Sequence, residues 1–122
     1  WQERLSDEGI KILVAQDDMK YIGMVGFIRN KSIKRNHSVT IWGTYVQDKY
    51  RGKKIGKLLM TEIINLIKDN SEIKKIKLEV VSSQLTALEL YKSLGFIECG
   101  KYHEEIKVGN KYYDEILMEM MI

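Results

Sequence analysis

A short glycine-containing cationic segment has the residue types needed to bind a phosphate. Residues 45–59 read YVQDKYRGKKIGKLL: a strand ends at Val46, a polar loop follows, and a helix opens near Lys53. The first turn of a helix exposes unpaired N–H groups and the positive end of the helix dipole. Gly52 and Gly56 would let this backbone approach a bulky anion closely. The positive charge around it comes from Lys53, Lys54 and Lys57.

Two familiar phosphate loops are excluded by spacing. A Walker A loop needs four residues between its glycines and then Lys-Ser or Lys-Thr, whereas three residues separate Gly52 from Gly56 and Leu58 follows Lys57. The dinucleotide fingerprint GxGxxG does not occur. On local spacing alone, a structural interpretation stays open, in which Gly52 starts a helix and Gly56 serves close packing.

Hydrophobic periodicity predicts the elements that position this segment. Short apolar or β-branched runs with turn residues between them predict strands, and a 3.6-residue period predicts helices. The expected strands are Lys11–Ala15, Tyr21–Asn30, His37–Val46, Lys75–Val81, Phe96–Tyr102 and Tyr112–Met121, and the expected helices are Lys53–Lys68 and the segment from Ala87 to Leu94. Gly95 is expected to cap the second helix, and Gly109-Asn110 to turn between the last two strands. Gly43, inside a strand, predicts a bulge or a close approach to the backbone.

The middle of this order is a βαβ unit, which requires a parallel strand pair, while both ends are antiparallel. A mixed sheet with helices on its faces follows. In the first helix, one face is expected to hold the apolar residues Ile55, Leu58, Leu59, Ile63, Leu66 and Ile67.

Composition narrows the functional class. The 122 residues are 44% hydrophobic and 30% charged, as in a soluble single domain, and no apolar run could span a bilayer. The net charge of +3 is spread along the chain, so a nucleic-acid partner is not indicated. One cysteine, Cys99, and no secretory signal favour the cytoplasm. Two distant histidines and no CxxC or HxxxH spacing predict no metal site.

The segment 51–56 resembles the pyrophosphate-binding motif of the GNAT superfamily of acyl-CoA-dependent N-acyltransferases, R/Q-x-x-G-x-G/A. Arg51 fills the first position and Gly56 the last, whereas Lys54 stands where the motif has its first glycine. The resemblance implies acetyl-CoA as co-substrate and backbone N–H groups as its ligands. The residues it implies at the pyrophosphate are Arg51, Gly52, Lys53, Lys54, Ile55 and Gly56.

A second segment resembles the same family independently. LEVVSSQLTALELYKSLGF, residues 78–96, is similar to the family pattern V-x-x-x-N-x-x-A-x-x-L-Y-x-x-x-G-F. The matching positions are Val80, Ala87, Leu90, Tyr91, Gly95 and Phe96. Gln84 replaces the asparagine that usually contacts the pantetheine arm, and it keeps the ability to donate and accept hydrogen bonds.

The resemblance also implies an architecture and a mechanism. It implies an α/β (mixed α+β) fold: a mostly antiparallel mixed sheet with a central splayed parallel strand pair and helices on both faces. Pantetheine would lie in the splay against the backbone of Thr44, Tyr45 and Val46. A backbone N–H near Val46 would stabilise the oxyanion. Tyr91 matches the family's general acid, which protonates the leaving CoA thiolate.

The general base stays open. An amine with a pKa near 10.4 must lose a proton before it attacks a thioester. Strand 37–46 contains no carboxylate, which leaves Glu79, His37 or a water chain as candidates. The acceptor amine is also open between small molecules and proteins, and a long final strand leaves a homodimer open.

The family normally begins with one more strand and two helices. Residues 1–5, WQERL, resemble the tail of the second of those helices, so we expect one domain over residues 1–122 that lacks its N-terminal part. Two other classes remain open: a non-catalytic acyl-CoA-binding module, and a small basic nucleic-acid-binding domain.

Overall fold

One twisted, seven-stranded sheet runs through the described residues. The computed structural model describes residues 2–7, 9–52 and 54–122, and of residues 2–7 the backbone alone. The strands are β1 (Gln2–Asp7), β2 (Ile10–Asp17), β3 (Lys20–Arg29), β4 (Ser38–Val46), β5 (Lys75–Val81), β6 (Ile97–Val108) and β7 (Lys111–Met121). Between them lie the 3-10 helix η1 (Asp48–Tyr50) and the helices α1 (Ile55–Lys68) and α2 (Leu85–Leu94).

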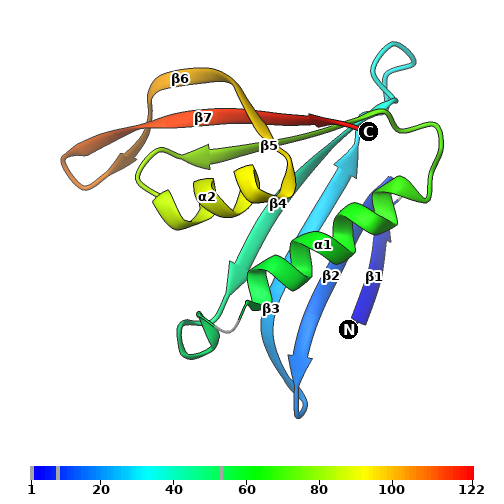
Figure 1. Ribbon diagram of the computed structural model, residues 1–122, viewed down its shortest axis with the longest axis horizontal. Coiled ribbons are helices and arrows are strands. Elements are labelled where there is room, and N and C mark those ends of the chain that lie inside the picture. Colours follow the sequence, from blue (N-terminus) through cyan, green and yellow to red (C-terminus); the bar gives the residue numbers. More distant parts are fainter. Residues whose placement is uncertain (1, 8, 53) are drawn as a thin grey trace.

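The sheet order is β1-β2-β3-β4-β5-β7-β6 (Figure 1). Its neighbours are antiparallel except β4 and β5, which are parallel and joined through α1. This is the mixed, mostly antiparallel α/β fold that the sequence predicts, with its one parallel pair at the centre. The predicted turn is also confirmed, because Val108 pairs with Lys111 and Gly109 has φ +62°.

Both helices cover the same face of the sheet (Figure 1). Alternate strand residues on that face, such as Val25, Val39 and Ile76, are fully buried and share one core with residues of α1 and α2. The prediction of helices on both faces therefore differs from the described residues, in which α1 and α2 lie on one face only.

The inward stripe of α1 also differs from the predicted one. The buried residues of the helix are Leu59, Met60, Ile63, Ile64 and Ile67. Leu58, expected inside, is 51% exposed. The predicted and observed stripes differ by a small rotation about the helix axis, which periodicity alone resolves poorly when apolar residues are adjacent.

The prediction for the first residues was wrong. Residues 2–7 form the edge strand β1, antiparallel to β2, with Leu5 opposite Lys11, and not the tail of a helix. The prediction of a helix for so short a segment took no account of the unpaired N–H and C=O groups that β2 offers at the sheet edge. Trp1 lies outside the described residues.

The tip of the β2–β3 hairpin generates a stability prediction. Asp17 pairs with Lys20, and the two residues between them have positive φ, 51° at Asp18 and 72° at Met19. Two-residue turns of this kind favour Asn-Gly, because most side chains are strained in the left-handed region. The double substitution of Asp18→Asn and Met19→Gly should raise the free energy of unfolding by about 1 kcal/mol in urea titration. A decrease would contradict this turn geometry, and Lys20→Gly, outside the strained positions, is the destabilising control.

Candidate functional site

The central parallel pair opens towards its carboxyl end. In the part of the chain that the structure describes, β4 and β5 pair only from Ser38 opposite Lys75 to Thr40 opposite Lys77. Beyond this point β4 stays paired with β3, and β5 stays paired with β7 to its last residue, Val81. The two strands therefore splay, and backbone groups on their facing edges are left without a ladder partner.

A bulge at Gly43 shapes the β4 side of this opening. Trp42 lies opposite Gly26 and Tyr45 opposite Met24, so β4 carries one extra residue here, and Gly43 has φ +67°. The predicted bulge is confirmed. A bulge shifts the alternation of side chains by one, so the residues after it exchange faces.

The side chains after the bulge lie on the sheet faces that this exchange predicts. Thr44 faces the helices, with its Oγ1 3.8 Å from the sulfur of Met60 in α1. Val46 faces the same way and touches the start of α1: a methyl group added at Gly56 would lie 3.8 Å from Val46 Cγ2. Tyr45, between them, lies on the opposite face, where it is 52% exposed and lines a mostly apolar hollow of about 360 Å³ with Met24.

Helix α1 begins beside this bulge. Its N-cap, Lys54, has φ 62° and no side-chain capping bond, and its carbonyl accepts the N–H of Leu58 at 3.1 Å. The N–H groups of the first turn therefore lack intrahelical partners, and no acidic residue stands in that turn. Gly56 lies here against Leu90 of α2, so the start of α1 adjoins the second helix. Such a helix start favours anions. Lys53 lies outside the described residues.

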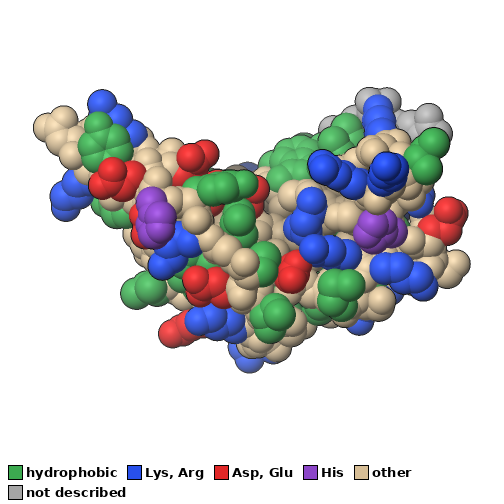
Figure 2. Space-filling model, turned by 90° about the horizontal axis from the view of Figure 1, so that it is seen from above, with side chains coloured by type: hydrophobic (Ala, Val, Ile, Leu, Met, Phe, Trp, Pro, Cys, Tyr) green, Lys and Arg blue, Asp and Glu red, His purple; other side chains and the backbone are tan. Residues whose placement is uncertain are grey.

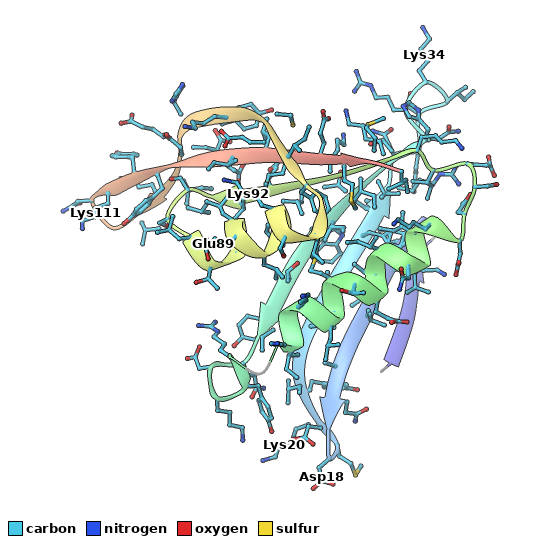
Figure 3. The ribbon with its side chains drawn as sticks, in the orientation of Figure 1. Asp18, Lys20, Lys34, Glu89, Lys92 and Lys111 are labelled. Carbon is cyan, nitrogen blue, oxygen red and sulfur yellow. The ribbon has the colours of Figure 1, made fainter. Side chains whose placement is uncertain are left out.

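The loop before α1 is braced by its own side chains. Arg51 donates from Nε to the carbonyl of Val46 at 3.1 Å and pairs with Asp48 at 2.7 Å. Tyr50 donates to Asp17 at 3.0 Å, at the tip of the β2–β3 hairpin, whose Asp18 and Lys20 are labelled in Figure 3. Arg51 thus lies against its own loop, and its contact with pyrophosphate stays a prediction. The Asp17–Tyr50 brace was missed, because no local pattern links residues 33 positions apart.

Tyr91 lies in α2, inside the splay. Its side chain is 8% exposed and meets the ring of Phe96 edge-on at 6.2 Å. Burial raises the pKa of the Tyr91 phenol, and a hydrogen bond with the Thr44 side chain partly offsets that rise in pKa. The Tyr91 phenol therefore stays protonated at neutral pH. Glu89 and Lys92 lie on the exposed side of α2 (Figure 3).

Gln84 stands at the other end of the same helix face. It is the N-cap of α2, is exposed, and makes no side-chain capping bond. Tyr91 follows it by seven positions, which is about two helical turns, so both lie on one side of α2. The structure thus brings Thr44, Val46, Gly56 and Tyr91 together around the splay.

The two candidate bases lie apart from one another. The carbonyl of His37 accepts the N–H groups of Lys74 and Lys75 at the closed end of the parallel pair. Thr44 is seven residues along the strand from His37, roughly 20 Å away. Glu79 is exposed on β5 and shares a hydrogen bond with Glu115 of β7; burial and this neighbour raise the pKa of Glu115.

A separate group of basic side chains lies away from this site. The exposed Lys31, Lys34 and Arg35 lie in the β3–β4 loop, at the opposite end of β4 from the bulge; Figure 3 labels Lys34, and Figure 2 shows several Lys and Arg side chains on the face that it views. Across the described residues, no three His, Cys, Asp or Glu side chains form a group that could hold a metal ion. Within the same residues, none of the helices has the length and apolar character to cross a membrane.

A family model described as "Acetyltransferase (GNAT) family" matches residues 1–96. This chain belongs to the GNAT family. An L-amino acid N-acetyltransferase of Escherichia coli is 32% identical over 97 residues, which cover 79% of this chain and 59% of that protein. Human N-acetyltransferase 8 is 28% identical over 98 residues, covering 80% of this chain and 43% of that protein. The GNAT chain thus spans 59% or less of the length of these curated relatives.

Solved structures share the fold of this GNAT chain. An acetyltransferase of the GNAT family from Streptococcus pneumoniae superposes with a TM-score of 0.89 at 22% identity, over 96% of this chain and 70% of that one. The ribosomal-protein-S18-alanine N-acetyltransferase of Escherichia coli superposes with a TM-score of 0.83 at 21% identity, over 96% and 72%.

The Glu79–Glu115 pair generates a pH prediction. Because the folded-state pKa of Glu115 is raised, the folded protein holds this proton more tightly than the unfolded chain does, and stability falls as pH rises past the ordinary carboxyl value of 4.5. Glu115→Gln keeps a hydrogen-bond donor for Glu79 without the second charge. It should raise the free energy of unfolding at about pH 7 by roughly 0.5 kcal/mol, which is measured as a higher Tm. At about pH 4 it should leave Tm unchanged. Glu89→Gln on exposed α2 is the control, and equal gains at both pH values would contradict the account.

Proposed function

We propose that this protein is an N-acetyltransferase that transfers an acetyl group from acetyl-CoA to a primary amine of a small molecule or protein. The observation that carries the proposal is the splay itself. The buried, neutral Tyr91 faces it from α2, the bulged end of β4 lies on its other side, and the start of α1 lies at its open end. Ligands of open α/β sheets bind at the carboxyl ends of parallel strands, as here.

The start of α1 is the proposed pyrophosphate site. Its unpaired first-turn N–H groups point away from the helix body, and Gly56 presents no side chain that would cover them. The proposed site also includes Gly52, Lys54 and Ile55 around the first turn of α1, and Lys53 is added on the basis of the motif. Arg51 acts here by holding the loop closed on Val46 and Asp48, a supporting role that its bonds favour.

The pantetheine arm would follow the splay. The backbone of Thr44, Tyr45 and Val46 has hydrogen-bonding groups along this edge of β4, because β5 no longer pairs with it. Gln84, which is exposed and makes no side-chain capping bond, would contact the arm from α2. The residues present therefore fit an acyl-CoA, which supplies the activated acetyl group.

The chemistry needs one bond made and one broken. The acceptor nitrogen attacks the thioester carbonyl, the C–N bond forms, and the C–S bond breaks as the oxyanion collapses. A backbone N–H near Val46 would stabilise that oxyanion. Tyr91 gives its proton to the departing thiolate, and the proton of the amine leaves to solvent through water. Glu79 is the one carboxylate of β5, but its bond to Glu115 ties it to the sheet.

A primary amine is the acceptor class that the relatives support. The Escherichia coli protein is named for L-amino acids, and a structural neighbour for the alanine of a ribosomal protein. Both acceptors present an α-amino group. An acyl-CoA-binding module without catalysis would need the start of α1 but not the Tyr91 hydroxyl, and substitutions distinguish the two.

Binding of acetyl-CoA should depend on the surface of Gly56. Gly56→Glu puts a carboxylate where the pyrophosphate would bind, so we expect affinity to fall by more than about thirtyfold in isothermal titration. Gly56→Ala is the matched control, because its methyl meets Leu90 and Val46 at an ordinary 3.8 Å, and affinity should fall far less. ATP serves as the comparison ligand. Equal affinity of both variants for acetyl-CoA would contradict the assignment of the pyrophosphate site to the start of α1.

Turnover should depend on the Tyr91 hydroxyl. Tyr91→Phe keeps the ring against Phe96 but removes the proton donor, so kcat should fall by about a hundredfold or more while acetyl-CoA still binds. Turnover is measured as CoA thiol release across a panel of primary amines. A wild-type rate in Tyr91→Phe would show that Tyr91 is not the general acid. Acetyl-CoA binding without turnover in the full-length wild type would favour the non-catalytic binding module.

A further inference from the structure

The loop between β4 and α1 leads to the proposed pyrophosphate site but contributes little to the core. Among its described residues, in the range 47–54, none is buried. Gly52 has φ +84°, and Lys54, the N-cap of α1, has φ 62°. A lysine in the left-handed region is strained, and such a conformation persists only where the surrounding structure fixes it. Contacts with other elements should therefore hold the shape of this loop.

The first of these contacts lies where the chain leaves β4. Gln47 donates its backbone N–H to the carbonyl of Ile22 at 2.8 Å and its side-chain Nε2 to the carbonyl of Tyr21 at 2.7 Å. Both acceptors belong to β3. The backbone and the side chain of the first loop residue are therefore both fixed to the neighbouring strand.

The second contact joins the end of η1 to the tip of the β2–β3 hairpin, at the same end of the molecule (Figure 1). The Tyr50 hydroxyl donates to Oδ2 of Asp17 at 3.0 Å, and the Tyr50 ring packs partly against the core. Asp17 is the last residue of β2 and pairs with Lys20 across a two-residue turn, so its position is closely defined. A carboxylate acceptor makes this hydrogen bond stronger than one between neutral groups.

The fixed part of the loop ends close to the start of α1. Tyr50 stands five positions before Ile55, the first residue of the helix. Arg51 is held to the carbonyl of Val46 at 3.1 Å and to Asp48 at 2.7 Å, so only residues 52–54 connect the fixed part to α1. An anion that meets an ordered helix start binds without the entropic cost of ordering the loop.

We propose that Tyr50 and Asp17 are positioning residues for the pyrophosphate of acetyl-CoA: their hydrogen bond fixes the β4–α1 loop to the β2–β3 hairpin and so preorganises the start of α1. This inference rests on the proposed function, in which that helix start binds the pyrophosphate. Neither side chain needs to touch the ligand, because each acts through the backbone of the loop. The hydrogen bond therefore serves acetyl-CoA affinity and not the transfer step.

Substitutions at the two positions test this hydrogen bond in the full-length protein. Tyr50→Phe keeps the ring but removes the donor, so Kd and KM for acetyl-CoA should rise by about fivefold or more while kcat stays near the wild-type value. Asp17→Ala should have a similar effect, whereas Asp17→Asn keeps an acceptor oxygen and should stay within about threefold of wild type. The double variant Tyr50→Phe/Asp17→Ala should bind no more weakly than either single variant, because both remove the same bond.

A second acetyl donor separates positioning from a general loss of structure. S-acetylpantetheine has the thioester and the pantetheine arm but no pyrophosphate, so Tyr50→Phe should weaken acetyl-CoA and leave S-acetylpantetheine unchanged. Kd is measured by isothermal titration and kcat/KM as thiol release. Tyr112→Phe is the matched control, because Tyr112 is an exposed tyrosine of β7. The ammonium of Lys107 lies 5.7 Å from its ring centre, as that of Lys49 lies 5.2 Å from the ring centre of Tyr50.

The outcomes distinguish failure of the positioning role from failure of the proposed site. An unchanged acetyl-CoA Kd in Tyr50→Phe and Asp17→Ala overturns the inference, even where the wild type binds acetyl-CoA far better than S-acetylpantetheine. Equal losses with both donors also overturn it, because the hydrogen bond would then support the fold as a whole. A wild type that binds the two donors equally contradicts the pyrophosphate site itself, and the positioning role with it.

Discussion

The site depends on a parallel strand pair that stops pairing after three residue pairs. β4 and β5 are hydrogen-bonded from Ser38 to Thr40 on one strand, and then each stays with its other neighbour. Buried backbone N–H and C=O groups need partners, so an opening of this kind is costly unless something else fills it. A ligand with amide groups of its own is suited to do so.

Two packed units keep the opening from closing. The apolar stripe of α1 packs under β2, β3 and β4, with Leu59, Ile63 and Ile67 fully buried. Each such side chain contributes about 1.5–3 kcal/mol by burial. On the other side, α2 packs through Leu88 and Tyr91 towards β5 and β7. The two helices come together where Gly56, at the start of α1, lies against Leu90 of α2, and packing on both sides maintains the splay between their strands.

Local chemistry made much of this predictable from the sequence. β5 has the predicted bounds Lys75–Val81, because strict alternation of polar and apolar residues has one interpretation. Gly95 caps α2 with φ 109°, as a glycine after the last apolar position should. Gly43 marks the bulge, because a glycine inside a strand often marks a bulge or a close approach to the backbone.

What the sequence left open depends on contacts between distant residues. The pairing of residues 2–7 with β2 depends on a free sheet edge, which no local pattern shows. The bonds of Arg51 depend on how the loop folds onto Val46 and Asp48, so a motif position did not reveal its partners. The inward turn of Thr44 follows from the Gly43 bulge once the register is known. The roles of Tyr91 and Gln84 remain predictions.

The most direct test of the proposed site is a crystal structure of the full-length protein with acetyl-CoA. The account predicts the pyrophosphate within hydrogen-bonding distance of the N–H groups of Ile55 and Gly56, the pantetheine between β4 and β5, and the thioester sulfur within reach of the Tyr91 hydroxyl. Acetyl-CoA bound elsewhere, with the splay empty and Tyr91 away from the sulfur, would contradict it.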